Sequence, residues 1–167
     1  RARPAGCRPD PTSGARAVPI YQSTSFVFEE AADAANLFAL QKYGNIYTRI
    51  SNPTTAAYEE RMASLEGGIG AVATASGQAA EFLTATALAG SGDNLVSASS
   101  LYGGTHTMSS TTLGRPGVEA RFCNGHDPES LAARVDAPTR CPSTDIIWNP
   151  SRPRADLRSP APAAAPP

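Results

Sequence analysis

Apolar and polar positions along the chain follow helical and strand-like spacings, and the first clear patterns are helical. Alanine-rich residues over 29–41, with the large apolar side chains clustered late, predict a helix that ends at Gly44. Asn52 before Pro53 is a typical helix start, an N-cap followed by proline at the first helical position. Apolar residues then recur at helical spacing, which predicts that this second helix runs to Gly67.

Four short apolar runs predict β-strands, and helical patterns lie between them. We expect strands over 69–74, 94–98, 118–122 and 144–148. We expect helices over 76–90, 103–113 and 127–135. This order of elements predicts an α/β fold with a mostly parallel sheet and flanking helices. Because ligands of such sheets bind outside the carboxyl ends of the strands, we direct attention to the loops 75–78, 99–104 and 124–127.

Composition divides the chain into three parts. Residues 1–52 are predicted to form an arm and a helix, and we expect residues 1–16 of the arm to pack on no other part of their own chain. Residues 53–149 are predicted to form a partial α/β domain. Residues 150–167 are rich in proline, alanine and arginine and hold almost no large apolar side chain, so we expect a disordered tail.

Charge and cysteine usage exclude several classes of protein. The net charge is -1 and charged residues make up 17% of the chain, which argues against a nucleic-acid or membrane-surface binder. No apolar run is long enough to span a bilayer. The three cysteines, Cys7, Cys123 and Cys141, are widely spaced and indicate a reducing, cytoplasmic compartment. Cys123 and His126 have the spacing of metal ligands but lack a second pair, so we expect no metal site.

Gly77 and Gln78 lie where a predicted helix begins after Ser76. Small residues let the backbone approach a ligand, and the first N–H groups of a helix have no partner inside it. Together with the helix dipole, this turn is a candidate cradle for a phosphate group. An ordinary capped helix with a glycine near its start explains the same residues, and both interpretations stay open.

Two other loops carry candidate binding residues. Tyr47 and Arg49 lie just before the helix that Asn52 caps, where a guanidinium and a phenol can bind one anion. Tyr102 follows the strand at 94–98, where its ring can stack on a flat ligand. Taken alone, the loop of Tyr47 and Arg49 is also explained as an ordinary surface loop with a buried tyrosine, and a tyrosine such as Tyr102 is more often simply packed.

Taken together, these segments resemble the Cys/Met-metabolism family of pyridoxal-phosphate enzymes, within it the O-acetylhomoserine sulfhydrylase (aminocarboxypropyltransferase) subgroup. The resemblance lies in PDPTSGARAVPIYQSTSFVFEEAADAANLFALQKYGNIYTRISNPTTAAYEERMASLEGGIGAVATASGQAA, SGDNLVSASSLYGGTHT and HDPESLAARVD. The resemblance covers about 9–136, and we expect it to be lost before residue 9 and after residue 136. It implies the N-terminal part of a fold-type-I pyridoxal-phosphate transferase. It also implies a small-molecule substrate and a homodimer or homotetramer.

The resemblance implies roles for five residues. Tyr47 and Arg49 match residues that bind the cofactor phosphate of the neighbouring subunit. Gly77 and Gln78 match the backbone turn that binds the phosphate within one subunit, and Tyr102 matches the tyrosine that stacks on the pyridine ring. Asn149 is a further match near the ring, although the residues before it fit poorly.

The family's catalytic residues have no counterpart in this chain. Family members are more than twice as long, and their later half supplies the Schiff-base lysine, the aspartate at the pyridine nitrogen and the arginine for the substrate carboxylate. Lys42, the only lysine, lies before the Tyr47 motif instead. We therefore expect an inactive fragment, from a truncated or frameshifted gene, of an enzyme that converts O-acetylhomoserine and sulfide to homocysteine. The alternatives are a non-catalytic fragment or pseudogene product, and a piece of a cystathionine synthase or methionine lyase.

Overall fold

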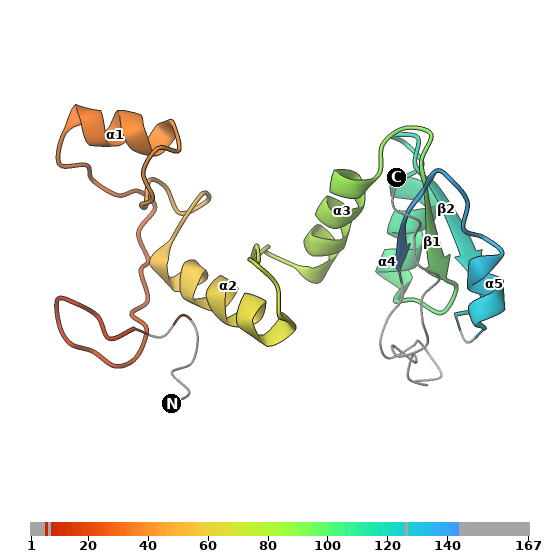
Figure 1. Cartoon of the computed structure of the whole chain (residues 1–167), viewed down its shortest axis with the longest axis horizontal. Helices are drawn as coiled ribbons and strands as arrows, with labels where there is room; N and C mark the ends of the chain where they lie inside the picture. Colours follow the sequence, from red (N-terminus) through yellow and green to blue (C-terminus); the bar gives the residue numbers. More distant parts are fainter. Residues whose placement is uncertain (1–5, 7, 126, 144–167) are drawn as a thin grey trace. The chain divides into compact units, whose positions relative to one another are not determined.

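The computed structural model describes residues 6, 8–125 and 127–143. The chain divides into two compact units, Arg1–Ala73 and Thr74–Pro167. The first unit holds the helices α1 (Ala31–Phe38) and α2 (Pro53–Glu66) (Figure 1). The second holds α3 (Gly77–Leu88), β1 (Asn94–Ala98), α4 (Gly103–Thr107), the π-helical turn η1 (Met108–Thr112), β2 (Glu119–Cys123), α5 (Pro128–Ala132) and β3 (Thr139–Ser143). The strand predicted over 144–148, Asn149, His126 and the tail 150–167 lie outside the described residues.

Both predicted helices of the first unit form. In α2, the side chain of Asn52 accepts a hydrogen bond from the N–H of Thr54 at 2.9 Å, and the helix ends at Gly67 with φ of 68°. Only glycine adopts that left-handed conformation without a steric penalty, so the sequence places this end correctly. α1 is shorter than predicted and ends at Phe38, since Leu40 takes a φ of 57° that no helix continues.

The strand predicted over 69–74 does not form. This segment is extended but joins no sheet, and the side chains of Ile69 and Val72 are fully or almost fully exposed. The N–H of Ala73 donates to Oε1 of Glu59 at 2.7 Å, a side chain rather than a strand. Apolar composition alone does not make a strand, because a strand also needs a neighbour that supplies the ladder of hydrogen bonds.

The arm contacts its own chain, and its beginning does so contrary to the expectation for residues 1–16, since a Cβ placed on Gly6 would clash with the carbonyl oxygen of Ala57 in α2. The N–H of Tyr21 donates to Oγ1 of Thr54 at 2.9 Å, and that hydroxyl donates to the carbonyl of Pro19 at 2.9 Å. The hydroxyl of Tyr21 lies 3.4 Å from Oδ1 of Asp10. The arm is therefore fastened to the first turn of α2.

The second unit contains a three-stranded, wholly parallel sheet in the order β2-β1-β3, which confirms the predicted α/β architecture. All five residues of the central strand β1 are buried. The edge strand β3 was not predicted, since a strand was expected over 144–148 instead, and β3 contains Pro142. An edge position tolerates proline, since one side of the strand needs no ladder partner. The register of β3 slips between Asn94 and Leu95 of β1.

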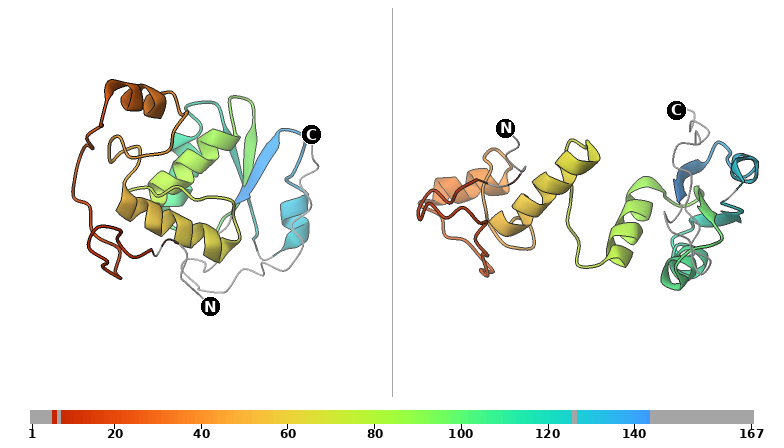
Figure 2. Two further views of the ribbon diagram at one scale, coloured as in Figure 1. Left: turned by 60° about the vertical axis from the view of Figure 1, so that its left-hand side comes forward. Right: turned by 90° about the horizontal axis from the view of Figure 1, so that it is seen from below.

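The core of the second unit lies between α3 and the sheet. Its buried cluster comprises Ala85, Ala89, Leu95, Leu113 and Val118, with Phe82 and Cys141 packed against it. The views in Figures 1 and 2 place α4 and α5 on opposite sides of the sheet. The predicted helix over 103–113 is α4 followed directly by η1, so the helical prediction is confirmed. The π-helical geometry of its second half was not predicted from this serine-rich and threonine-rich sequence.

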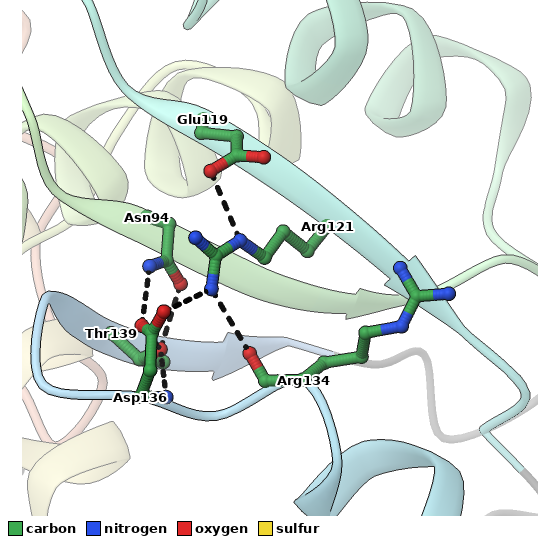
Figure 3. Close-up of polar contacts among 6 residues, drawn as sticks. All are labelled: Asn94, Glu119, Arg121, Arg134, Asp136 and Thr139. Atoms are coloured by element: carbon green, nitrogen blue, oxygen red, sulfur yellow. Dashed lines mark hydrogen bonds and ion pairs between the residues drawn. The ribbon is translucent and has the colours of Figure 1, made fainter.

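A polar cluster joins the three strands where they begin (Figure 3). Asn94, almost fully buried at the start of β1, donates to Oδ1 of Asp136 at 2.8 Å and accepts from the hydroxyl of Thr139 at 2.7 Å. Arg121 on β2 pairs with Oδ2 of Asp136 at 2.6 Å and with Glu119 at 3.0 Å. The cluster anchors β3 and the loop before it to the rest of the sheet.

Candidate functional site

The first turn of α3 presents unpaired backbone donors. The Ser76 hydroxyl accepts from the N–H of Ala79 at 3.1 Å, which caps the helix. Within the described residues, no acceptor takes up the N–H groups of Gly77 and Gln78. The first turn has no acidic side chain, and a Cβ placed on Gly77 meets no atom within 4 Å. An anion can therefore approach these two donors along the helix dipole.

An open groove of about 630 Å³ lies between this turn and α4. Its lining consists of Gln78, Ala79, Phe82, Gly103, Gly104, Thr107, Met108 and Thr112. These side chains are small, apolar or neutral, so the groove offers a surface for a flat apolar ring and no competing charge.

The side chain of Gln78 is held by two partners. Its Nε2 donates to Oε2 of Glu81 at 3.0 Å and to Oγ1 of Thr105 at 3.0 Å. The hydroxyl of Thr105, a buried residue of α4, in turn donates to the same Oε2 at 2.8 Å. The three side chains form a closed hydrogen-bonded triad between α3 and α4.

Tyr102 lies beside this triad. It precedes α4 as its N-cap residue, and its side chain is mostly exposed. A Cβ placed on Gly104 lies 2.7 Å from Cε1 of Tyr102 and 3.3 Å from Cδ of Gln78. A side chain at position 104 would therefore crowd both the tyrosine ring and the glutamine amide, and one of them would have to move. The structure brings together Gln78 and Tyr102, two of the predicted site residues.

Tyr47 and Arg49 lie in the first unit, on a turn that the arm holds. Tyr47 pairs with Ser25 in an isolated antiparallel bridge, and the turn at 48–50 follows it. Both side chains are exposed, and within the described residues neither the Tyr47 hydroxyl nor the Arg49 guanidinium has a hydrogen-bond or ion-pair partner. Two anion-binding donors are thus available on one turn.

Asn52 holds that turn in place. Its buried side chain donates to the carbonyl of Tyr21 at 2.9 Å and to Oγ1 of Thr48 at 3.1 Å. The Thr48 hydroxyl also donates to the carbonyl of Ser23, and its N–H donates to the carbonyl of Thr24 at 2.9 Å. The residue that caps α2 therefore also positions the segment between Tyr47 and Arg49.

Lys42, the only lysine, is committed to an ion pair. Its Nζ lies 2.6 Å from Oδ1 of Asp33 in α1. The hydrogen bond to Asp33, together with the charges of Asp33 and Glu29, raises the pKa of Lys42 above its ordinary value. A protonated ammonium is not a nucleophile, so this environment opposes formation of a Schiff base.

Cys123 and Cys141, the cysteines that the structure describes, form no disulfide with each other. Burial raises the pKa of both Cys123 and Cys141, which favours the thiol over the nucleophilic thiolate. No cluster of three or more metal-ligating side chains occurs among the described residues. In the same part of the chain, no helix has the length and apolarity needed to cross a membrane.

Sequence reasoning did not find Glu81, Thr105, Gly104 or the second role of Asn52. Glu81 and Thr105 are separated by a strand, and no local pattern relates them. The doubled glycine at 103–104 is the one signal available, since it marks a close approach of backbone to other atoms without saying to which.

Comparisons with known protein sequences find one family and several relatives. The family model described as Cys/Met metabolism PLP-dependent enzyme matches residues 3–164, which extends beyond 9–136 and corrects the narrower range expected above. The chain is 50% identical over 161 residues to O-acetyl-L-homoserine sulfhydrylase 1 of Thermus thermophilus, covering 96% of this chain and 38% of that protein. It is 47% identical over 146 residues to a homocysteine synthase of Schizosaccharomyces pombe, covering 87% and 34%.

Similar solved structures include an O-acetylhomoserine (thiol)-lyase and a cystathionine gamma-lyase. One is described as an O-acetylhomoserine (thiol)-lyase of Campylobacter jejuni with a pyridoxyl-lysine phosphate, at 41% identity and a TM-score of 0.84, covering 90% of this chain and 37% of that one. The other is a cystathionine gamma-lyase of Lactobacillus plantarum in complex with L-serine, at 29% identity and a TM-score of 0.77, covering 91% and 37%. The chain therefore spans little more than a third of these relatives.

Proposed function

The chain belongs to the Cys/Met metabolism family of pyridoxal-phosphate-dependent enzymes, and from this premise we propose that it provides the phosphate-binding portion of an O-acetylhomoserine sulfhydrylase. The observation that carries the proposal is the first turn of α3, with two unpaired N–H groups beside an open groove. In the proposed reaction sulfide replaces the acetate of O-acetylhomoserine, which yields homocysteine and acetate. Acting alone, the chain binds the cofactor weakly and does not catalyse this reaction.

The residues present fit the phosphate of the cofactor. A phosphate monoester needs several donors and no facing carboxylate. The N–H groups of Gly77 and Gln78 supply donors in one unit, and the first turn of α3 has no acidic residue. Tyr47 and Arg49 supply a phenol and a guanidinium on an exposed turn of the other unit. Since we propose that the turn with Arg49 serves the neighbouring subunit, the working enzyme is a homo-oligomer.

Each residue has a separate task in this proposal. Gly77 and Gln78 bind the phosphate through the backbone, and Arg49 and Tyr47 add charge and a further donor. Tyr102 covers one face of the ring from the loop after β1. Bound pyridoxal phosphate supplies an electron sink for amino-acid chemistry, and the protein supplies orientation. Lys42 serves none of these tasks because it is paired with Asp33.

A second candidate lies within the same family. The similarity to a cystathionine gamma-lyase, at 29% identity, supports a cystathionine synthase, cystathionine lyase or methionine lyase. The identities of 50% and 47% to sulfhydrylases and homocysteine synthases favour the first proposal. A non-catalytic fragment or pseudogene product is the alternative outside the enzyme class, and Lys42 as the only lysine favours it for the isolated chain.

We place the enzyme in the cytoplasm, where amino-acid precursors and reduced thiols coexist.

Equilibrium dialysis with two aldehyde-free probes tests the phosphate-binding role. Pyridoxine 5′-phosphate and pyridoxine differ in the phosphate, and neither forms a Schiff base. We expect the chain to prefer the phosphorylated probe. Gly77→Pro removes one donor at a helical position that tolerates proline, after a Ser76 whose ψ of 159° suits a following proline. This variant should lose about tenfold to a hundredfold of the preference.

Gly77→Ala is the matched control for that experiment. It retains the N–H, and its Cβ meets open space, so its preference should equal that of the unmodified chain. A chain that binds both probes equally would refute the proposed function. Equal preference in the proline and alanine variants would show that the phosphate binds elsewhere.

A further inference from the structure

We propose that Glu81 and Thr105 are positioning residues that set the phosphate-binding turn of α3 against α4, an inference that rests on the proposed function. Neither residue is one of the proposed phosphate donors, and the contact between the two runs through their side chains. They act through Gln78, whose side-chain amide both of them hold. Neither residue belongs to the cofactor contacts that the family resemblance implies.

The hydrogen-bond inventory of Gln78 gives the first argument. A side-chain amide nitrogen has two protons, and both are used here, one by Glu81 and one by Thr105. The side chain therefore has no donor left for an anion in the groove. Its backbone N–H remains unpaired within the described residues, so residue 78 can bind a phosphate only through its backbone.

The charge of Glu81 gives the second argument. Glu81 lies three residues after Gln78, on the same face of α3, and a carboxylate there opposes the approach of a phosphate. Its Oε2 accepts from both Gln78 and Thr105, at 3.0 Å and 2.8 Å. These bonds turn the carboxylate toward α4. Removing one donor frees it to rotate toward the helix N-terminus.

The link to Tyr102 gives the third argument. Thr105 and Gly104 are neighbours in α4, and the Cβ position of Gly104 lies close to both the Tyr102 ring and the Gln78 amide. Thr105 is 4% exposed, so its hydroxyl has no water to replace a lost partner. The triad thus couples the turn that faces the phosphate to the loop that carries the ring contact.

Thr105→Val tests the inference, because valine keeps the shape of threonine and removes the hydroxyl. We expect the ratio of pyridoxine phosphate to pyridoxine affinity to fall about threefold to tenfold. Thr105→Ser keeps the hydroxyl and should retain the ratio within about twofold. Glu81→Gln keeps an acceptor oxygen for both bonds and should retain or raise the ratio. A general loss of packing would weaken both probes together and leave the ratio unchanged.

A spectroscopic readout follows the triad directly. The chain has three glutamines, so ¹⁵N-glutamine labelling gives three side-chain amide pairs, and the pair missing in Gln78→Met identifies Gln78. We expect this pair to move in Thr105→Val and to stay in place in Thr105→Ser. If the valine variant does not fold, Thr105→Ala takes its place, because it also lacks the hydroxyl and is compared with Thr105→Ser in the same way.

The outcomes separate the inference from the proposed function. An unmodified chain without phosphate preference overturns the proposed function and, with it, the inference. A phosphate preference that Thr105→Val leaves unchanged, in a folded protein, overturns the inference alone. A reduced ratio with an unmoved Gln78 amide pair also overturns it, because the effect would then not pass through the triad.

Discussion

At the scale of single residues, Gly104 is a position of the candidate site where a side chain would meet close neighbours. A Cβ at Gly104 would lie 2.7 Å from Cε1 of Tyr102 and 3.3 Å from Cδ of Gln78, so a side chain there would force a neighbour to move. Gly103, its neighbour in α4, faces open space. Two adjacent glycines of one helix therefore differ in what a methyl group would meet, which makes them a matched pair.

Gly104→Ala should displace the ring of Tyr102, because its Cβ would lie 2.7 Å from Cε1. We expect a changed near-ultraviolet circular dichroism of tyrosine and a weaker affinity for pyridoxine phosphate. Gly103→Ala should leave both unchanged. Identical spectra and affinities for the two variants would show that the ring does not rest against Gly104 in solution.

Asn52 is the second residue with more than one task, since it caps α2 and ties the arm to the turn before it. Asn52→Ala should lower the free energy of unfolding of the first unit by about 2–3 kcal/mol, through loss of the cap and of two buried donors. Asn52→Asp keeps the cap oxygen and loses only the donors, so it should fall between alanine and the unmodified chain. Urea unfolding with hydrogen exchange over 47–58 measures this order. An aspartate variant as stable as the unmodified chain would contradict the tying role.

At the scale of elements, β3 depends on polar contacts at its start. Arg121 holds the pKa of Asp136 below its usual value through a hydrogen bond, and Asn94 and Thr139 act in the same direction. A carboxyl group whose folded-state pKa is lowered contributes stability above its unfolded pKa, about 3.9, and loses it as pH falls through the folded value. The anchoring of β3 is therefore complete at neutral pH and is lost in acid.

Asp136→Asn should lower the urea midpoint of the second unit at pH 7, and the difference from the unmodified chain should shrink toward pH 3. Glu119→Gln is the control, since Glu119 pairs with the same arginine from a more exposed position and should change the midpoint less. A pH-independent difference for the Asp136 variant would refute the electrostatic anchoring of β3.

Elements signalled by their own residues were predictable from the sequence. The cap at Asn52, the stop at Gly67 and the start of α3 after Ser76 are local chemistry, and all three are confirmed. The prediction of a strand over 69–74 was wrong, because a strand needs a neighbouring strand to complete its hydrogen bonds, and the local sequence does not show whether one is present. β3 was missed because a strand that contains proline fits only a sheet edge, and the order of strands depends on the whole sheet.

The candidate site likewise has one part that the local sequence predicts and one part that only the fold shows. The donors at Gly77 and Gln78 follow from a helix start, and the sequence alone locates them. The triad with Glu81 and Thr105 joins side chains from α3 and α4, which precede and follow β1 in the sequence. Only the folded chain brings these side chains together.

At the scale of the whole molecule, the chain exposes apolar side chains that a larger fold would cover. α2 has no buried residue, and Tyr58 and Leu65 on it are exposed. In the extended segment, Ile69 and Val72 are exposed as well. Apolar residues on an unpaired extended segment are a template for association.

We therefore expect the purified chain to form oligomers or aggregates at micromolar concentration. The double variant Ile69→Lys, Val72→Lys should reduce association, because charge on an extended edge opposes pairing. Leu83→Lys, on the exposed side of α3, tests whether helix faces contribute as well. Sedimentation velocity measures the size distribution. A monodisperse monomer for the unmodified chain would contradict this expectation.

The central claim is that the chain keeps the residues that bind the phosphate of pyridoxal phosphate and lacks the covalent anchor. The most direct test is borohydride reduction of the chain saturated with pyridoxal phosphate, followed by intact-mass analysis and peptide mapping, with Lys42→Arg as the blank. The account predicts reversible binding, no internal-aldimine absorbance band and no stoichiometric pyridoxyl adduct, because Lys42 is held as an ammonium by Asp33. A stoichiometric adduct on Lys42 that is absent from the blank would contradict it.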